Sequence, residues 1–131
     1  MRRNSTRLFL ILIVVVMTMS AGFAQQKKKA NPCDSAQNQT EMNICAEKEY
    51  KAADATLNKV YAQLMSKLED EHKVKLKEAE LAWIKFRDAN CEFQAFPNMG
   101  GTIYPLVYSG CLTATTLDRI KELRAALEEF K

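Results

Sequence analysis

The sequence is poor in histidine, glycine and proline, and its four cysteines form no C-x-x-C pair. The single histidine, His72, lies among charged residues, so the sequence does not favour a zinc site and we expect no metal and no cofactor. A lone histidine without a positioned partner is also a poor general base, which argues against catalysis. Neither glycine nor proline occurs between Pro32 and Pro97, and this absence favours long uninterrupted helices.

The chain also lacks a second long apolar run. The one that is present covers residues 8–19, follows three arginines and precedes the small residues of the segment 21–24. Because this run is shorter than the about 20 apolar residues that span a bilayer, it is typical of a cleaved signal peptide. We therefore predict a signal peptide over residues 1–24 and export to the periplasm or the medium. A retained membrane anchor is the weaker alternative.

Without the predicted signal peptide the chain has no net formal charge. It has 19 basic and 16 acidic residues in all, and the three arginines of the signal peptide leave 16 of each sign. Binding to nucleic acid or to an anionic membrane needs an excess of Lys and Arg, so we expect neither partner. We expect a flexible polar lead-in over residues 25–37 and a single domain over residues 38–131.

Four cysteines in a small exported domain indicate disulfides, because such domains are oxidised and gain stability from cross-links. We expect two bonds among Cys33, Cys45, Cys91 and Cys111. An oxidised cysteine is not a nucleophile, so the thiols offer no route to catalysis either. We therefore expect a protein that is not an enzyme.

The apolar pattern predicts an all-α fold with three main helices. The first begins at Asn38, where the side chains of Asn38 and Glu41 satisfy free amide groups of the first turn, and it runs for about 30 residues. Its apolar residues recur at three- and four-residue steps: Met42, Ala46, Ala53, Leu57, Val60, Leu64 and Leu68. A charged break near residue 71 separates it from the second helix.

The second helix combines aromatic, charged and thiol side chains between Trp83 and Cys91. At about 100° per residue, Trp83 and Phe86 fall on one arc, and Arg87 and Cys91 lie beside that arc. Aromatic residues at this spacing are usually core, so we predict that Trp83 and Phe86 face inward.

An antiparallel hairpin of the first two helices places Asp54 level with the Arg87-Asp88 pair. We predict a partly buried ion pair there, completed by Asn58 and by nearby tyrosine hydroxyls. The alternative is a set of solvated surface charges. A buried pair of this kind fixes the register of two helices more than it adds stability.

The same register disfavours one disulfide. Cys45 lies about 9 Å along the helix axis from Cys91, and bridged Cα atoms lie within about 7 Å. Two pairings remain open: Cys33–Cys45 with Cys91–Cys111, or Cys33–Cys91 with Cys45–Cys111.

Residues 93–110 mix glycine and proline with aromatic residues, which predicts a long loop before a third helix over about 117–130. Long loops in compact domains tend to be functional, and the aromatic content argues against disorder. We expect this loop to bind a partner through Phe96, Gly100, Gly101, Thr102, Tyr104 and Tyr108.

Short motifs occur in a fixed order along the chain: Met42-Asn43-x-Cys45-Ala46, Ala53-Asp54-x-x-Leu57-Asn58-x-x-Tyr61, Trp83-x-x-Phe86-Arg87-Asp88-x-x-Cys91, Gly100-Gly101-Thr102 and Arg119-x-x-x-Leu123. Together they resemble the LprI-type lysozyme inhibitor family, formerly a domain of unknown function. The resemblance covers nearly the whole mature chain. It implies a small, helical, disulfide-bonded exported protein that inhibits lysozyme. Unlike the lipoprotein that names the family, this chain has no anchoring cysteine.

We interpret the chain as a protein-binding module of the lysozyme-inhibitor type that acts through the loop at residues 96–110. A lysozyme cleft carries two carboxylates, toward which the backbone amides of Gly100-Gly101-Thr102 can point. Arg119 joins Asp54, Asn58, Arg87 and Asp88 in a network that we interpret as structural. The alternative function is an envelope structural or stress protein without activity toward lysozyme, in which the loop aromatics only pack over the end of the bundle.

Overall fold

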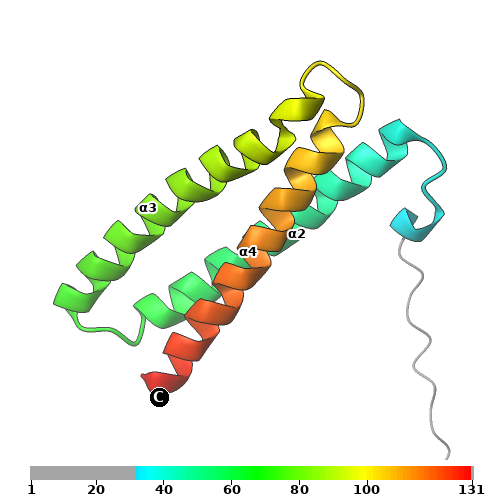
Figure 1. Ribbon diagram of the computed structural model, residues 1–131. Helices are drawn as coiled ribbons and strands as arrows, with labels where there is room; N and C mark the ends of the chain where they lie inside the picture. Colours follow the sequence, from blue (N-terminus) through cyan, green and yellow to red (C-terminus); the bar gives the residue numbers. More distant parts are fainter. Residues whose placement is uncertain (1–31, 131) are drawn as a thin grey trace, which may run out of the picture. The chain divides into compact units, whose positions relative to one another are not determined.

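The structure, a computed structural model, describes residues 32–130. The predicted signal peptide and most of the lead-in lie outside these residues. The described part consists of a short 3-10 helix η1 (Pro32–Ser35), the helices α2 (Gln39–Met65) and α3 (Asp70–Ala95), a 3-10 turn η2 (Phe96–Asn98) and the helix α4 (Tyr104–Glu129) (Figure 1). The prediction of an all-α fold with three main helices is confirmed.

Helix α2 begins where the sequence predicts. The side chain of Asn38 accepts a hydrogen bond from the amide of Glu41 at 3.0 Å, and the Glu41 carboxylate accepts one from the amide of Gln37 at 2.8 Å. The first contact satisfies an amide that the first turn leaves unpaired, and the second ties the residue before the N-cap to that turn. The helix ends at Met65, and α3 begins at Asp70, so the break falls slightly before residue 71.

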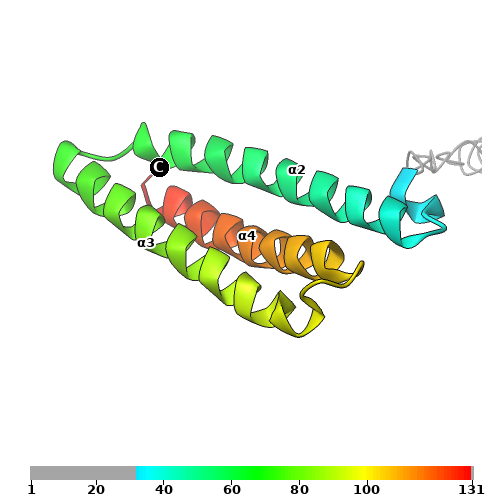
Figure 2. The ribbon, with the colours of Figure 1, turned by 90° about the horizontal axis from the view of Figure 1, so that it is seen from above.

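Helix α4 packs along both other helices, running in the direction of α2 and opposite to α3 (Figure 2). Its contact with α2 is the more extensive and contains most of the apolar core, made of Leu57, Val60, Leu64, Ile120 and Leu123, and Leu68 from the turn after α2 completes this core. Helix α3 adds only partly buried residues to this core, Leu76 and Trp83. The core therefore belongs mainly to α2 and α4, with α3 attached to their side.

The inward face of α3 differs from the predicted one. Its buried residues are Glu80, Arg87, Cys91 and Ala95, whereas Phe86 is 61% exposed. The prediction that Phe86 is core is therefore wrong. The disulfide at Cys91 and the ion pairs of two inward charged residues decide which side of α3 faces the body. Phe86 is therefore turned outward, whereas Trp83 stays partly buried against the core.

The predicted loop is shorter than residues 93–110. Helix α3 continues to Ala95, α4 begins at Tyr104, and only residues 96–103 connect them. Pro105 lies in the first turn of α4, where its missing N–H needs no helical partner. Gly110 lies inside α4, where a Cβ in its place would meet nothing within 4 Å. Both breakers are thus compatible with the helix that contains them.

Candidate partner-binding surface

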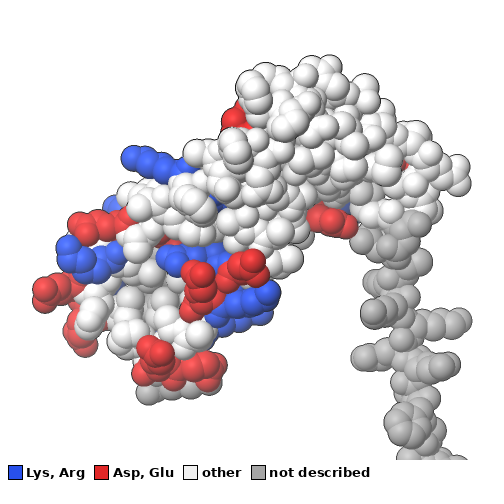
Figure 3. Space-filling model, in the orientation of Figure 1, with Lys and Arg blue, Asp and Glu red and all other residues white. Residues whose placement is uncertain are grey.

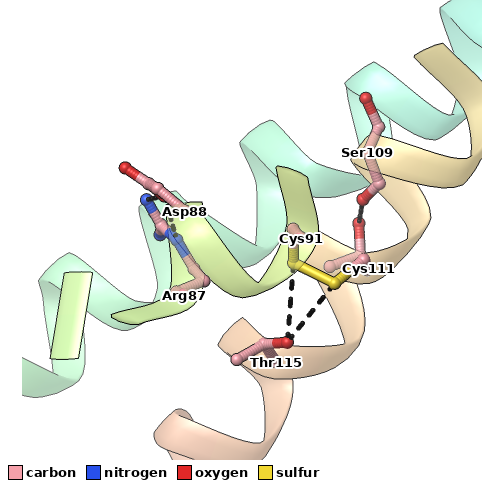
Figure 4. Close-up of a disulfide and its surroundings, with 7 residues drawn as sticks. Arg87, Asp88, Cys91, Ser109, Cys111 and Thr115 are labelled. Atoms are coloured by element: carbon pink, nitrogen blue, oxygen red, sulfur yellow. Dashed lines mark hydrogen bonds and ion pairs between the residues drawn. A yellow bond between two sulfur atoms is a disulfide. The ribbon is translucent and has the colours of Figure 1, made fainter. Parts of the chain in front are cut away.

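The disulfides follow the first of the two pairings left open by the sequence. Cys33 is bonded to Cys45 and Cys91 to Cys111, each with a Cα–Cα distance of 5.5 Å. The second bond joins α3 to α4 in the interior, and Thr115 Oγ1 lies 3.9 Å from both of its sulfurs (Figure 4). This bond anchors the last turns of α3 beside the start of α4.

Arg87 is the centre of the predicted ion-pair network. Its side chain is buried, and its Nε and Nη2 each lie 2.8 Å from Asp88 Oδ1. Its Nη1 lies 3.7 Å from Asp54 Oδ1 on α2, and Asn58 donates to the other oxygen of Asp54 at 3.1 Å. The level alignment of Asp54 with Arg87 expected from the sequence is present. Arg87 thereby connects α3 to α2, two helices with little backbone contact.

Aromatic rings, rather than tyrosine hydroxyls, complete the surroundings of Arg87. The guanidinium carbon lies 5.4 Å from the Tyr50 ring centre and 5.1 Å from that of Trp83. A cation over a ring face is attracted by the ring quadrupole. Burial raises the pKa of Tyr50, and the positive charge of Arg87 partly offsets that rise.

Arg119 belongs to a separate cluster. Its Nη2 lies 2.9 Å from Glu80 Oε2, and its Nη1 lies 2.8 Å from Glu122 Oε2. Burial disfavours the charged guanidinium, but the hydrogen bonds to Glu122 and Glu80 outweigh burial and raise the pKa of Arg119. Its guanidinium carbon also lies 5.7 Å from the Trp83 ring centre, so Trp83 contacts the arginines of both clusters.

Sequence reasoning missed Glu80 as a partner. Glu80 lies seven residues before Arg87, so both face the same side of α3. The seven-residue spacing of Glu80 and Arg87, together with the basic Arg119 on the third helix, is the pattern from which the Glu80–Arg119 ion pair could be predicted. The pattern is not apparent when Trp83 and Phe86 are taken as the inward face of α3.

The connection between α3 and α4 is nearly uncharged, together with the helix turns of α3 and α4 on either side of it. Residues 89–117 contain a single charged residue, Glu92. In the view of Figure 3 the end with this connection carries few charged side chains, whereas acidic and basic residues crowd the opposite end. Phe96, Met99 and Ile103 are large apolar residues that are exposed in the connection itself. We call the surface formed by these three residues and Gly100, Gly101 and Thr102 the apolar tip.

Several contacts hold the apolar tip in place. Asn43 of α2 donates to the carbonyl of Thr102 at 2.8 Å, and the amide of Gly101 donates to the carbonyl of Asn98 at 2.9 Å. Gly100 has a φ of 79°, a left-handed conformation that residues with a Cβ rarely adopt. With the nearby disulfide, these contacts fix the backbone of an otherwise short and exposed connection.

Tyr104 and Tyr108 lie on the first turns of α4 and contact the fold. Their rings stack with centres 5.9 Å apart, and the Tyr104 hydroxyl donates to Glu92 Oε2 at 2.8 Å. That hydrogen bond raises the pKa of Tyr104, and burial raises the pKa of Tyr108. The structure thus brings Phe96, Gly100, Gly101 and Thr102 together and places the two tyrosines beside them on a helix.

Residues 32–130 lack both a metal-site arrangement and a membrane-spanning helix. These residues contain no group of three His, Cys, Asp or Glu side chains arranged to hold a metal ion. They also contain no helix that is long and apolar enough to cross a membrane.

Comparisons with known proteins give a matching family model, a relative and a solved structure of similar fold. The profile described as "Lysozyme inhibitor LprI" matches residues 30–123. An uncharacterized protein of Rhizobium meliloti (strain 1021) is 37% identical over 109 residues, which cover 73% of this chain and 78% of that protein. A crystal structure of a DUF1311 family protein from Pseudomonas putida KT2440 is similar in fold, with a TM-score of 0.63 at 21% identity over 71% of this chain and 96% of that one.

Proposed function

The chain belongs to the LprI lysozyme-inhibitor family, and from this premise we propose that it is an exported protein-binding module that inhibits lysozyme through the apolar tip. The observation that carries the proposal is the exposure of three large apolar side chains in the connection between α3 and α4, within a stretch, residues 89–117, that has a single charged residue. Exposed apolar clusters of this kind are typical of interaction sites. The two disulfides agree with an oxidising compartment outside the cytoplasm.

The apolar tip is suited to binding because its backbone is already ordered. Gly100 adopts its special conformation without strain, and hydrogen bonds from Asn43 and Gly101 hold the residues on either side. A preorganised surface loses less conformational entropy on association than a flexible one. Apolar side chains that become fully buried at the centre of an interface contribute most of its affinity.

The glycines offer backbone donors to a lysozyme cleft. The amide of Gly101 already bonds to the carbonyl of Asn98. Within Gly100-Gly101-Thr102, the amides that can donate to a partner are therefore those of Gly100 and Thr102. Backbone amides can hydrogen-bond to the carboxylates of a glycosidase cleft, and the apolar side chains of the tip would exclude water around them. Because the mature chain is neutral, attraction arises from shape and desolvation rather than from net charge.

The test is inhibition of lysozyme-driven cell lysis by the exported protein and two variants. Met99→Asp places a charge on the apolar tip, and Val74→Asp places the same charge at an exposed apolar position in the first turns of α3, at the charged end. We expect a tenfold molar excess of the unmodified protein and of Val74→Asp to slow lysis, and Met99→Asp to lose at least about tenfold in potency. No slowing by the unmodified protein, or equal potency of both variants, contradicts the proposal.

The alternative is a structural role in the cell envelope, in which Tyr104 and Tyr108 serve packing. The contacts of these two tyrosines favour a packing role for them. Tyr104 and Tyr108 stack on each other, and Tyr104 bonds to Glu92. Replacing both by serine should lower the melting temperature by several degrees if they serve packing. A lysozyme inhibitor that uses the apolar tip should keep its potency in this variant below its melting temperature.

A further inference from the structure

The outward face of α3 carries an apolar stripe that the body of the molecule leaves uncovered. Six residues recur at alternating steps of three and four: Ala79, Ala82, Phe86, Ala89, Phe93 and Phe96. All six are exposed, and Phe86, Phe93 and Phe96 expose 61%, 78% and 61% of their surface. We call this set the outer seam of α3.

The outer seam has the geometry of a helix-pairing surface. At about 100° per residue it lies on the side of α3 opposite to the buried Arg87 and Cys91. Phe96, at the C-cap, extends the seam because its φ of −50° and ψ of −41° remain helical. Alternating steps of three and four are the a and d positions of a coiled coil, where side chains of one helix fit between those of another.

The seams of two copies are complementary in shape when the two α3 helices run in opposite directions. We propose that the outer seam pairs two copies of this chain through antiparallel packing of α3 against α3. In an antiparallel pair the a positions of one helix face the d positions of the other. Phe86 then faces Ala89 of the second copy, Phe93 faces Ala82, and Phe96 faces Ala79. Each phenylalanine meets an alanine, so every large side chain has a space to enter and no two rings collide.

Charge supports the same register. Lys85 and Glu92 flank the seam on one side, at the positions that lie next to each other in antiparallel coiled coils. In the register set by the phenylalanine–alanine pairs, Lys85 of each copy lies beside Glu92 of the other. Two ion pairs, related by the two-fold axis, therefore border one side of the interface. A surface that bound an unrelated helix would not require phenylalanine–alanine and Lys85–Glu92 complementarity within the seam itself.

The size of the interface indicates a reversible dimer. Six phenylalanines that bury most of their exposed surface contribute on the order of 800 Å². The alanines and the flanking side chains bring the total to the lower end of specific protein interfaces, about 1,200 Å². Phe96 belongs to both the outer seam and the apolar tip, whereas Met99 and Ile103 lie beyond the end of the helix, so the dimer would carry one apolar tip at each end with its Phe96 buried. The dimer is measured without lysozyme, so failure of this inference is distinguishable from failure of the proposed function.

The test is sedimentation of the exported, oxidised protein over about 1 to 500 μM, compared with Ala89→Glu and Ala62→Glu. Ala62 is an exposed alanine of α2 outside the seam, so Ala62→Glu is a matched control. We expect the unmodified protein and Ala62→Glu to convert from monomer to dimer within this range, and Ala89→Glu to weaken dimerisation at least about tenfold. Protein that stays monomeric at all concentrations, or a dimer that Ala89→Glu leaves unchanged, overturns the proposal.

The register has a test of its own. Ala82→Phe forces two rings into one space, and Phe93→Ala leaves a void at the same layer, so each single change should weaken the dimer about tenfold. Together the two changes place the phenylalanine at residue 82 and the alanine at residue 93, so the layer again pairs one ring with one alanine. The double variant should therefore recover a dimer affinity within about threefold of that of the unmodified protein. A double variant as weak as the product of both single effects excludes the antiparallel register.

Discussion

Arg87 contacts groups from two helices with a single buried side chain. It lies 2.8 Å from Asp88 on α3, 3.7 Å from Asp54 on α2, and over the rings of Tyr50 and Trp83. The two carboxylates are 41% and 47% exposed, so water can solvate them when the guanidinium is absent. Arg87 therefore contributes position and packing more than Coulombic energy.

We expect Arg87→Met to lower the free energy of unfolding by about 1–2 kcal/mol, less than for a fully buried ion pair. In double-mutant cycles the coupling of Arg87 with Asp88 should be about 1 kcal/mol, and that with Asp54 about half as large, because the latter contact is longer. Urea unfolding of the single and double variants measures both energies. A coupling with Asp54 that is indistinguishable from zero would show that Arg87 does not connect α3 to α2.

Three tyrosines near the apolar tip have raised pKa values. Burial raises the pKa of Tyr50 and Tyr108, and the hydrogen bond to Glu92 raises that of Tyr104. The folded protein then keeps hydroxyl protons that the unfolded chain has lost. Their stabilising contribution is complete below about pH 10, the ordinary pKa of tyrosine, and is lost as the pH rises through the folded pKa values.

Stability measured by urea unfolding between pH 8 and 11 should therefore fall steeply above about pH 10. Replacing Tyr50, Tyr104 and Tyr108 by phenylalanine removes the three hydroxyls, so this variant should show a shallower fall. Equal slopes for the two proteins above pH 10 would assign the alkaline loss to other groups.

At the scale of elements, α3 is attached differently from α2 and α4. Helices α2 and α4 share the apolar core, whereas the buried residues of α3 are Glu80, Arg87, Cys91 and Ala95. Ion pairs and a disulfide thus replace much of the apolar contact that usually holds a helix in a bundle. Because these bonds hold α3 against the other helices, Phe86 and Phe93 need not be buried for α3 to stay attached.

Removing the disulfide between Cys91 and Cys111 should release α3 first. The bond spans 20 residues, and loop entropy assigns it about 3 kcal/mol. In the variant with both cysteines changed to alanine, amide hydrogens of α3 should exchange much faster, whereas those around Leu57 and Ile120 in the core should remain protected. Removing the other disulfide is the control, because it does not touch α3. Unchanged exchange in α3 would show that its ion pairs suffice.

The start of α2 was predictable and the start of α4 was not, for a local reason. Asn38 and Glu41 form a capping pair that depends on residues a few positions apart. Pro105 and Gly110 read as loop residues by their propensities, but a proline in the first turn and a glycine inside a helix are both tolerated when contacts elsewhere fix the helix. The disulfide of Cys111 and the packing of α4 on α2 supply those contacts.

Across the whole molecule, the charged side chains are concentrated toward one end. One end carries the apolar tip, and the other carries most of the acidic and basic side chains (Figure 3). A charged end keeps a small protein soluble while the apolar tip remains open for a partner. In the proposed dimer the two tips lie at opposite ends of the paired helices, and Phe96 of each tip is part of the interface.

Export can be checked on the intact protein. We expect the form recovered outside the cytoplasm to begin at Gln25, with a mass that alkylation changes only after reduction, because all four cysteines are paired. Intact-mass spectrometry with and without reductant measures both points. A protein that retains the first 24 residues would support the anchored alternative instead.

The all-α class, the three helices, the start of the first helix and the level alignment of Asp54 with Arg87 could be predicted from the amino-acid sequence. These features depend on hydrophobic period, capping residues and short-range spacing, which are local. The inward face of α3, the pairing of the cysteines and the end of the connection to α4 became known only from the packing of the helices. Both sides of α3 carry a helical apolar pattern, so the pattern alone does not tell which side is buried. The buried side is set by contacts with other helices, namely the disulfide to Cys111 and the ion pairs with Asp54 and Arg119.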